Sequence, residues 1–183
     1  MKALTTLLAA GALALAVGQH VNAKILTLDL EAMVAATDDA VLGTIVDRTV
    51  IRVDHPIDGP ELYYTTLTIQ GESLRSGEER QVDVTFPGGF IDAENGAWNS
   101  EAPSVDDTVL GREVVVFSRW SDNLGGDVAA NALYASHGGL YTTIDTREGK
   151  IVQGRGEGYA IPMNVTVSRL RDDITSFAQA QKK

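Results

Sequence analysis

The chain has 183 residues, with 15 lysines and arginines against 25 aspartates and glutamates and no cysteine, so its net charge is −10 with histidine neutral. The absence of cysteine excludes disulfides and thiolate metal sites. The acidic balance opposes binding to nucleic acid and to anionic lipid headgroups, and we expect no nucleic-acid partner.

Residues 1–23 have the pattern of a secretory signal peptide. Met1-Lys2 gives a positive start, Ala3 to Gly18 is an apolar run, and Val21-Asn22-Ala23 offers small residues for cleavage after Ala23. The sequence therefore predicts a periplasmic or extracellular protein with no membrane anchor after cleavage. Removing 23 of the 183 residues leaves 160 (residues 24–183), with 14 basic and 25 acidic side chains and a net charge of −11. That length is enough for a single domain with its own core.

A helix and a long β-rich segment come next. Apolar residues recur at three- and four-residue steps from Leu28 to Thr37, which predicts a short helix. Ala40 to Val53 is mostly β-branched, which predicts a strand that breaks or bends near Asp47-Arg48. Gly43 interrupts this run and indicates a bulge or a tight bend, as sharply coiled strands need.

Two further strands complete an antiparallel meander. Turn-forming residues from His55 to Pro60 predict a hairpin loop, after which Tyr63 to Gln70 resumes as a strand. In Gln81–Gly89 (QVDVTFPGG) apolar and polar residues alternate until Pro87, and the glycine pair then ends the strand abruptly. The segment from Phe90 to Gly111 has no regular period, and such long loops in compact domains are usually functional or disordered.

The second half of the chain predicts more strands and a closing helix. Arg112 to Trp120 contains a continuous apolar run, typical of a strand buried on both faces. Leu140 to Ile144 and Ile151 to Gln153 flank a hairpin turn. Apolar residues at helical spacing predict a C-terminal helix over about 165–180.

These elements predict a mainly β fold. We expect a small antiparallel barrel of five or six strands, with a short N-terminal helix and a C-terminal helix. A β-sandwich is the alternative. The position of Gly43 and the strand lengths favour the barrel, because closure removes exposed sheet edges.

Four stretches of the chain carry a resemblance: 28–34 (LDLEAMV), 39–46 (DAVLGTIV), 82–89 (VDVTFPGG) and 109–117 (VLGREVVVF). Over roughly Leu28 to Gln153 the chain resembles a group of secreted bacterial OB-like β-barrel proteins of unassigned function. The resemblance implies a fold and an export route, and it transfers no catalytic residue. Residues 72–79 and the C-terminal helix depart from the pattern. Although some OB-like barrels bind oligonucleotides, fold is not function, and the net charge opposes that activity here.

The irregular loops 90–111 and 121–126 are the candidate binding surfaces. An exposed aromatic side chain in a loop can stack on a sugar or anchor a protein partner. Trp98, with the polar Asn95 and Asn99 around it, is the candidate for that role. We expect Trp120, beside a buried strand, to lie in the core.

No convergent catalytic set is evident from the sequence. His137 is the weak candidate for a catalytic residue, because residues 136–139 (SHGG) place a histidine and a hydroxyl where glycine lets backbone approach closely. Adjacent residues of a strand point to opposite faces, so Ser136 cannot simply be the nucleophile of His137. There is also no GxSxG motif.

Metal binding would have to use oxygen ligands. Residues 24–183 contain two histidines and no cysteine, which is a poor set for zinc. Calcium takes oxygen ligands from loops, and Asp122, Asn123 and Asp127 are the candidates in one glycine-containing loop. They do not match the EF-hand pattern, and we expect no other cofactor.

The sequence therefore predicts an exported, non-enzymatic binding module. It would act on an unidentified protein or carbohydrate partner through loops 90–111 and 121–126. Two alternatives remain open. One is a hydrolase centred on His137 with carboxylates from the loops, and the other is a calcium-stabilised structural protein of the envelope.

Overall fold

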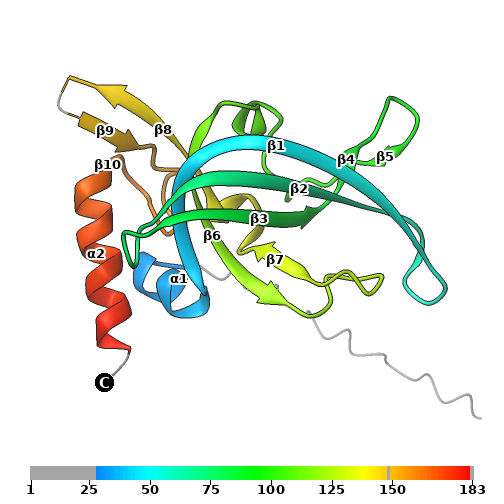
Figure 1. Ribbon diagram of the computed structural model, residues 1–183, viewed down its shortest axis with the longest axis horizontal. Helices are drawn as coiled ribbons and strands as arrows, with labels where there is room; N and C mark the ends of the chain where they lie inside the picture. The colour runs from blue at the N-terminus through cyan, green and yellow to red at the C-terminus, as the bar shows by residue number, and fades with distance from the viewer. Residues whose placement is uncertain (1–27, 148, 182–183) are drawn as a thin grey trace, which may run out of the picture.

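Five strands close into a barrel (Figure 1). The computed structural model describes residues 28–147 and 149–181, so the predicted signal peptide lies outside the described residues. The barrel strands lie in the order β1-β2-β3-β7-β6, and β6 pairs back with β1. Their bounds are β1 Asp39–His55, β2 Gly59–Ser73, β3 Glu79–Pro87, β6 Glu113–Ser121 and β7 Ala130–Leu133. The predicted mainly β barrel, with five strands and a helix near each end, is confirmed.

The remaining elements surround the barrel. Helix α1 is Leu30–Ala36 and helix α2 is Val167–Ala180; within the described part of the chain, neither has the length and apolar character needed to cross a membrane. Strands β8 Leu140–Thr146, β9 Gly149–Val152 and β10 Val165–Thr166 extend the sheet beyond β6. The irregular segment after β3 contains a small hairpin, β4 Gly89–Phe90 and β5 Gly96–Ala97, and a 3₁₀ turn, η1 Asp106–Thr108. A second 3₁₀ turn, η2, is Ser136–Gly139.

The C-terminal helix begins two residues later than predicted. Val165 and Thr166 pair with β9 as β10 instead of opening the helix. Thr166 then caps it, because its Oγ1 accepts the backbone N–H of Arg169 at 3.3 Å. The buried Leu170 and Ile174, one and two turns further on, dock α2 on the barrel beside α1 (Figure 1).

The barrel closes at the first half of β1. Residues 41–44 pair with β2 on one side and with β6 on the other. Gly43 lies opposite Gly71 of β2, and a Cβ at Gly43 would lie 2.5 Å from the carbonyl oxygen of Gln70. The register shift of the ladder lies between Ile45 and Asp47. Gly43 therefore allows a close backbone approach, and the bulge falls at Val46, where β1 bends without breaking.

Two hydrophobic cores lie on opposite faces of the same strands. In β6, Val114 and Val116 point into the barrel, whereas Val115 and Phe117 point outward against the helices. β1 alternates in the same way, with Val41 inside and Leu42 outside. The prediction that this strand is buried on both faces is therefore confirmed for residues 114–118, because one face fills the barrel and the other carries α1 and α2.

The close approach at Gly43 gives a stability prediction. We expect Gly43→Ala to lower the free energy of unfolding by about 2–3 kcal/mol, because the added methyl group overpacks against fixed backbone. Urea denaturation measures the change. Gly138→Ala is the matched control, since its Cβ would meet Tyr159 at an ordinary 3.5 Å; we expect a loss below about 1 kcal/mol. Equal losses for the two variants would contradict the close-approach explanation.

Candidate functional site

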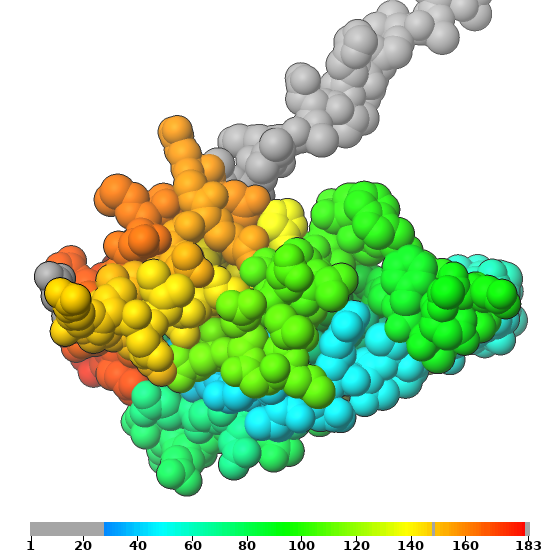
Figure 2. All heavy atoms as spheres, turned by 90° about the horizontal axis from the view of Figure 1, so that it is seen from above, coloured from blue at the N-terminus to red at the C-terminus, as the bar shows by residue number. Residues whose placement is uncertain are grey.

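A cleft of about 400 Å³ opens at one end of the barrel. Thr65 of β2 and Phe86 of β3 are paired in the ladder, are both buried, and form its floor. Because side chains alternate along a strand, Thr65 lies on the same face as the core residue Leu67, and that face points into the barrel. The wall above this floor is the segment 89–108. Figure 2 shows this side of the molecule, where the green surface is hollowed beside the cyan surface of β1.

The glycine pair after Pro87 turns the chain across the barrel end. The N–H of Gly88 donates to the carbonyl of Tyr63 at 2.7 Å, and the hydroxyl of Thr65 donates to the carbonyl of Gly88 at 2.6 Å. Gly89 has a φ of 128°, and a Cβ there would collide with the Thr65 hydroxyl. Only glycine therefore allows the segment to lie this close to the floor of the cleft.

Polar side chains brace the segment from within. Asp92 accepts hydrogen bonds from the side chain of Asn95 and from its backbone N–H, both at 2.8 Å. Asn99 donates to the carbonyl of Pro87 at 2.9 Å and accepts from the N–H of Glu101 at 3.0 Å. The amides of Asn95 and Asn99, predicted as binding residues, are thus already engaged in holding the loop. Asn99 lines the cleft, and Asn95 does not.

Apolar side chains stand exposed around the cleft. Trp98 is 79% exposed and Phe90 is 51% exposed, and both line it together with Val105, which is 68% exposed. Ala102, from the same segment, packs against the barrel core and anchors this rim. The structure places Trp98, the candidate exposed aromatic, on the surface.

Trp120 is not a core residue, and that expectation is wrong. Its side chain is 52% exposed, and its indole N–H donates to Asp122 at 2.8 Å. Trp120 lies near the end of β6, past the buried residues 114–118 of that strand. It does not line the cleft that Trp98 borders.

His137 also lines the cleft, but both of its ring nitrogens have partners. Nδ1 lies 3.2 Å from the carbonyl oxygen of Glu101, and Nε2 lies 2.8 Å from the hydroxyl of Tyr159. A carbonyl only accepts, so the proton is on Nδ1 and Nε2 accepts from the tyrosine. The backbone N–H of His137 donates to the same carbonyl at 2.8 Å. His137 therefore ties the 89–108 segment to η2, which is a 3₁₀ turn and not the strand that the sequence suggested.

Three charged side chains line the cleft: Arg48, Asp107 and Arg155. Arg155 pairs with Asp107 at 3.0 Å, donates to the carbonyl of Leu140 at 2.9 Å and lies over the ring of Tyr141. Arg48 is exposed and comes from β1, beyond the point where β6 pairs with that strand. No local pattern in the sequence singles out Arg48, Phe90 or Arg155. They can be recognised only from the three-dimensional structure, because their place in the cleft depends on which strands end at the barrel mouth.

The second predicted loop, 121–126, lies on another side of the molecule. The hydroxyl of Tyr64 donates to the carbonyl of Leu124 at 3.2 Å, whereas the neighbouring Thr65 faces the cleft. Adjacent residues of a strand point to opposite faces, so the two loops lie on opposite sides of β2. They do not form one common surface.

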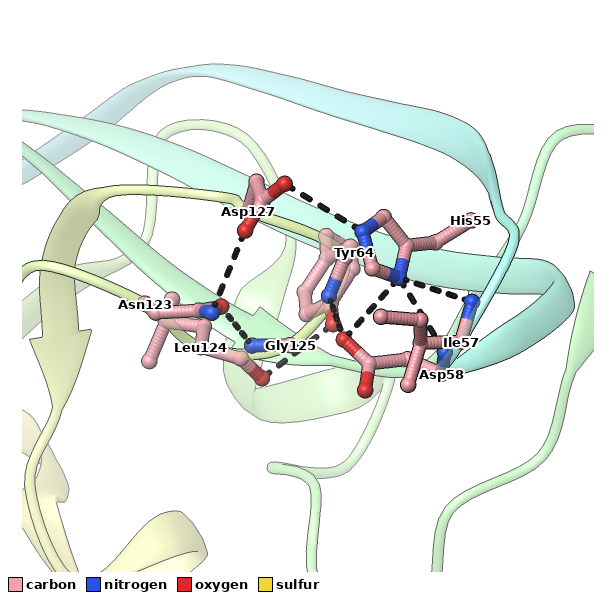
Figure 3. A network of polar contacts seen from close by, with 9 residues as sticks. His55, Ile57, Asp58, Tyr64, Asn123, Leu124, Gly125 and Asp127 are labelled. Carbon is pink, nitrogen blue, oxygen red and sulfur yellow. Dashed lines mark hydrogen bonds and ion pairs between the residues drawn. The ribbon is translucent and has the colours of Figure 1, made fainter.

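A polar network joins the 121–127 loop to the β1–β2 hairpin (Figure 3). We call His55, Asp58, Gly126 and Asp127 the loop clasp. The N–H of Gly126 donates to Asp58 at 2.7 Å, and Nε2 of His55 lies 3.2 Å from Asp127. Nδ1 of His55 accepts the N–H of Asp58 at 3.1 Å, which places the proton on Nε2, directed at Asp127. The polar groups of the loop clasp therefore bond to one another across the two loops.

Two of the three candidate calcium ligands lie together, since the side-chain amide of Asn123 donates to Asp127 at 3.4 Å, but each candidate already has a protein partner. The carboxylate of Asp122 accepts from the Trp120 indole, and Asp127 faces His55. The side-chain oxygen of Asn123 accepts the N–H of Gly125 at 2.7 Å, which closes the turn (Figure 3). Within residues 28–147 and 149–181, no three histidine or acidic side chains are grouped so as to hold a metal ion.

Comparison of the chain with family models, with curated proteins and with solved structures finds no match. The resemblance to secreted OB-like proteins stays a prediction. The candidate site rests on its own geometry.

The bracing of the 91–95 turn predicts a dependence on pH. The Asn95 side chain, and then the N–H groups of Glu94 and Asn95, lower the pKa of Asp92 below its ordinary value of 3.8. A lowered folded-state pKa gives stability that is complete above the ordinary value and is lost as the pH falls through the folded value. We expect the Glu94 and Asn95 amide signals in NMR spectra to shift only below about pH 4. Persistence of the same transition in Asp92→Asn would assign it to another group.

The engaged carboxylates also give a prediction for calcium. We expect millimolar calcium to move the midpoint of thermal unfolding by less than about 1 °C relative to chelator, because a ligand stabilises only a state that it binds. Differential scanning fluorimetry with both additions measures this. A rise of several degrees that disappears in Asp127→Asn would show that the loop rearranges to bind the ion.

Proposed function

We propose that this chain is an exported, non-enzymatic binding module whose ligand site is the cleft at the barrel end. The shape supports the proposal, because ligand sites are usually concave, largely apolar and furnished with a few polar groups. The cleft has a volume of about 400 Å³, within the range of such sites. The partner in this proposal is a carbohydrate or a protein, and export rests on the predicted signal peptide.

Trp98 carries the proposal. Its ring is 79% exposed, yet the chain on either side of it is fixed: Ala97 pairs with Gly89 in the β4–β5 hairpin, and Asn99 is bonded at both ends of its amide. A large aromatic side chain held in water on a braced backbone loses little conformational entropy when it binds. Burial of its apolar surface against a ligand contributes about 25 cal/mol of binding free energy per Å².

The hydrolase alternative has less support. A general base needs a ring nitrogen that faces the substrate, and both nitrogens of His137 are in use. The hydroxyl of Ser136 lies 3.4 Å from the carboxylate of Glu101, and no bond joins it to the ring of His137 within the described residues. The constellation therefore holds the loop in place without activating a nucleophile.

Substitution of Trp98 tests the proposal. We expect Trp98→Ala to weaken ligand binding at least tenfold, in line with the cost of removing a central aromatic anchor. The measurement is binding of labelled protein to panels of immobilised oligosaccharides and peptides, followed by titration of any ligand found.

Trp120→Ala is the matched control. It removes a second half-exposed tryptophan that lies outside the cleft, and we expect it to bind as the wild type does. Retained affinity in Trp98→Ala, or absence of binding on both panels, would remove the proposed function.

A further inference from the structure

The charge within the cleft is opposite in sign to that of the chain. Of the charged residues that line it, Asp107 and Arg155 neutralise each other at 3.0 Å, which leaves Arg48. Across residues 28–147 and 149–181, no hydrogen bond or ion pair engages the guanidinium of Arg48. The chain as a whole carries −10. Arg48 therefore gives the cleft an unpaired positive charge, although the chain as a whole is negative.

The strand register directs Arg48 toward the aromatic rim. Arg48 lies opposite Leu67, so it shares the face that leads into the barrel, whereas its neighbour Asp47 points away and accepts from Thr49 at 3.3 Å. Val50, two residues further on the same face, lies against the backbone of Gly89. Arg48 thus stands on the side of β1 that faces the 89–108 segment.

We propose that the cleft binds an acidic saccharide, with the carboxylate of a uronic acid residue on Arg48 and the sugar ring against Trp98 and Phe90. This rests on the proposed function of the cleft and specifies its ligand. A planar guanidinium matches a carboxylate with two parallel hydrogen bonds. Exposed aromatic rings offer flat apolar faces to the C–H surface of a sugar.

Size and charge favour this ligand class over its competitors. The volume of this cleft, about 400 Å³, lies within the range of small-ligand sites. A stable protein interface instead uses an extended surface of about 800 Å² on each partner. A single unpaired arginine suits the single charge of a carboxylate. A phosphate group, with a charge near −2, would draw more cations than the lining supplies.

Isothermal titration calorimetry on the full purified chain tests the proposal with three probes: a trimer of galacturonic acid, its methyl ester and a tri-glutamate peptide. We expect the acid trimer to bind and the uncharged ester to bind at least tenfold more weakly, as does the acid trimer to Arg48→Gln. Arg119→Gln is the matched control, because Arg119 is also exposed and lies outside the cleft. It should bind the acid trimer as the wild type does, and circular dichroism should show both variants folded.

The outcomes separate this inference from the proposed function. If the ester and the acid bind equally and Arg48→Gln has no effect, the acidic ligand is wrong while a Trp98-dependent cleft remains. Binding of the glutamate peptide alone, dependent on Arg48, would replace the saccharide by an acidic peptide. Failure of every probe to bind would overturn the inference, whereas only the broader panels decide the proposed function.

Discussion

The close approach of β1 and β2 at Gly43 and Gly71 is the constraint on which the rest of the structure depends. It lets residues 41–44 of β1 pair with β2 and β6 at once, so that one strand closes the barrel. Past Thr44 the pairing with β6 ends, and β1 continues beside β2 alone. The same strand therefore closes the barrel with its first half and forms one side of the barrel mouth with its second.

That mouth needs a cover, and the segment after β3 supplies it. Ala102 packs against the interior core, while the turns on either side remain at the surface. The segment is held by hydrogen bonds from Thr65, Asn99 and His137 rather than by a core of its own. The polar groups of this segment are therefore engaged in holding it in place. The aromatic rings and Arg48 are left facing outward, which is why we place binding there.

Local patterns predicted the fold well and the site poorly. The predicted elements that are present depend on neighbours in sequence. They are the strands with β-branched runs, the turns at 55–60 and 87–89, and the last helix with its apolar stripe. Trp98 was recognisable because polar residues surround it. Trp120 was misplaced because the burial of residues 114–118 does not extend to the end of the strand. Arg48 could not be found, since its role depends on where β6 stops pairing with β1, and no local pattern encodes that point.

The position of the cleft also shows why the fold alone is a poor guide to the site. OB-like barrels commonly use the loops after their first and fourth strands to bind oligonucleotides or oligosaccharides. In this chain those loops are the β1–β2 hairpin and the segment after β6, and the loop clasp joins them through His55, Asp58 and Asp127. Their polar groups satisfy one another, so a ligand there would first have to break these bonds. On the opposite face of β2, the cleft offers groups with no such partners. The available chemistry, and not the analogy of fold, is therefore the reason that we propose a binding site at the barrel mouth.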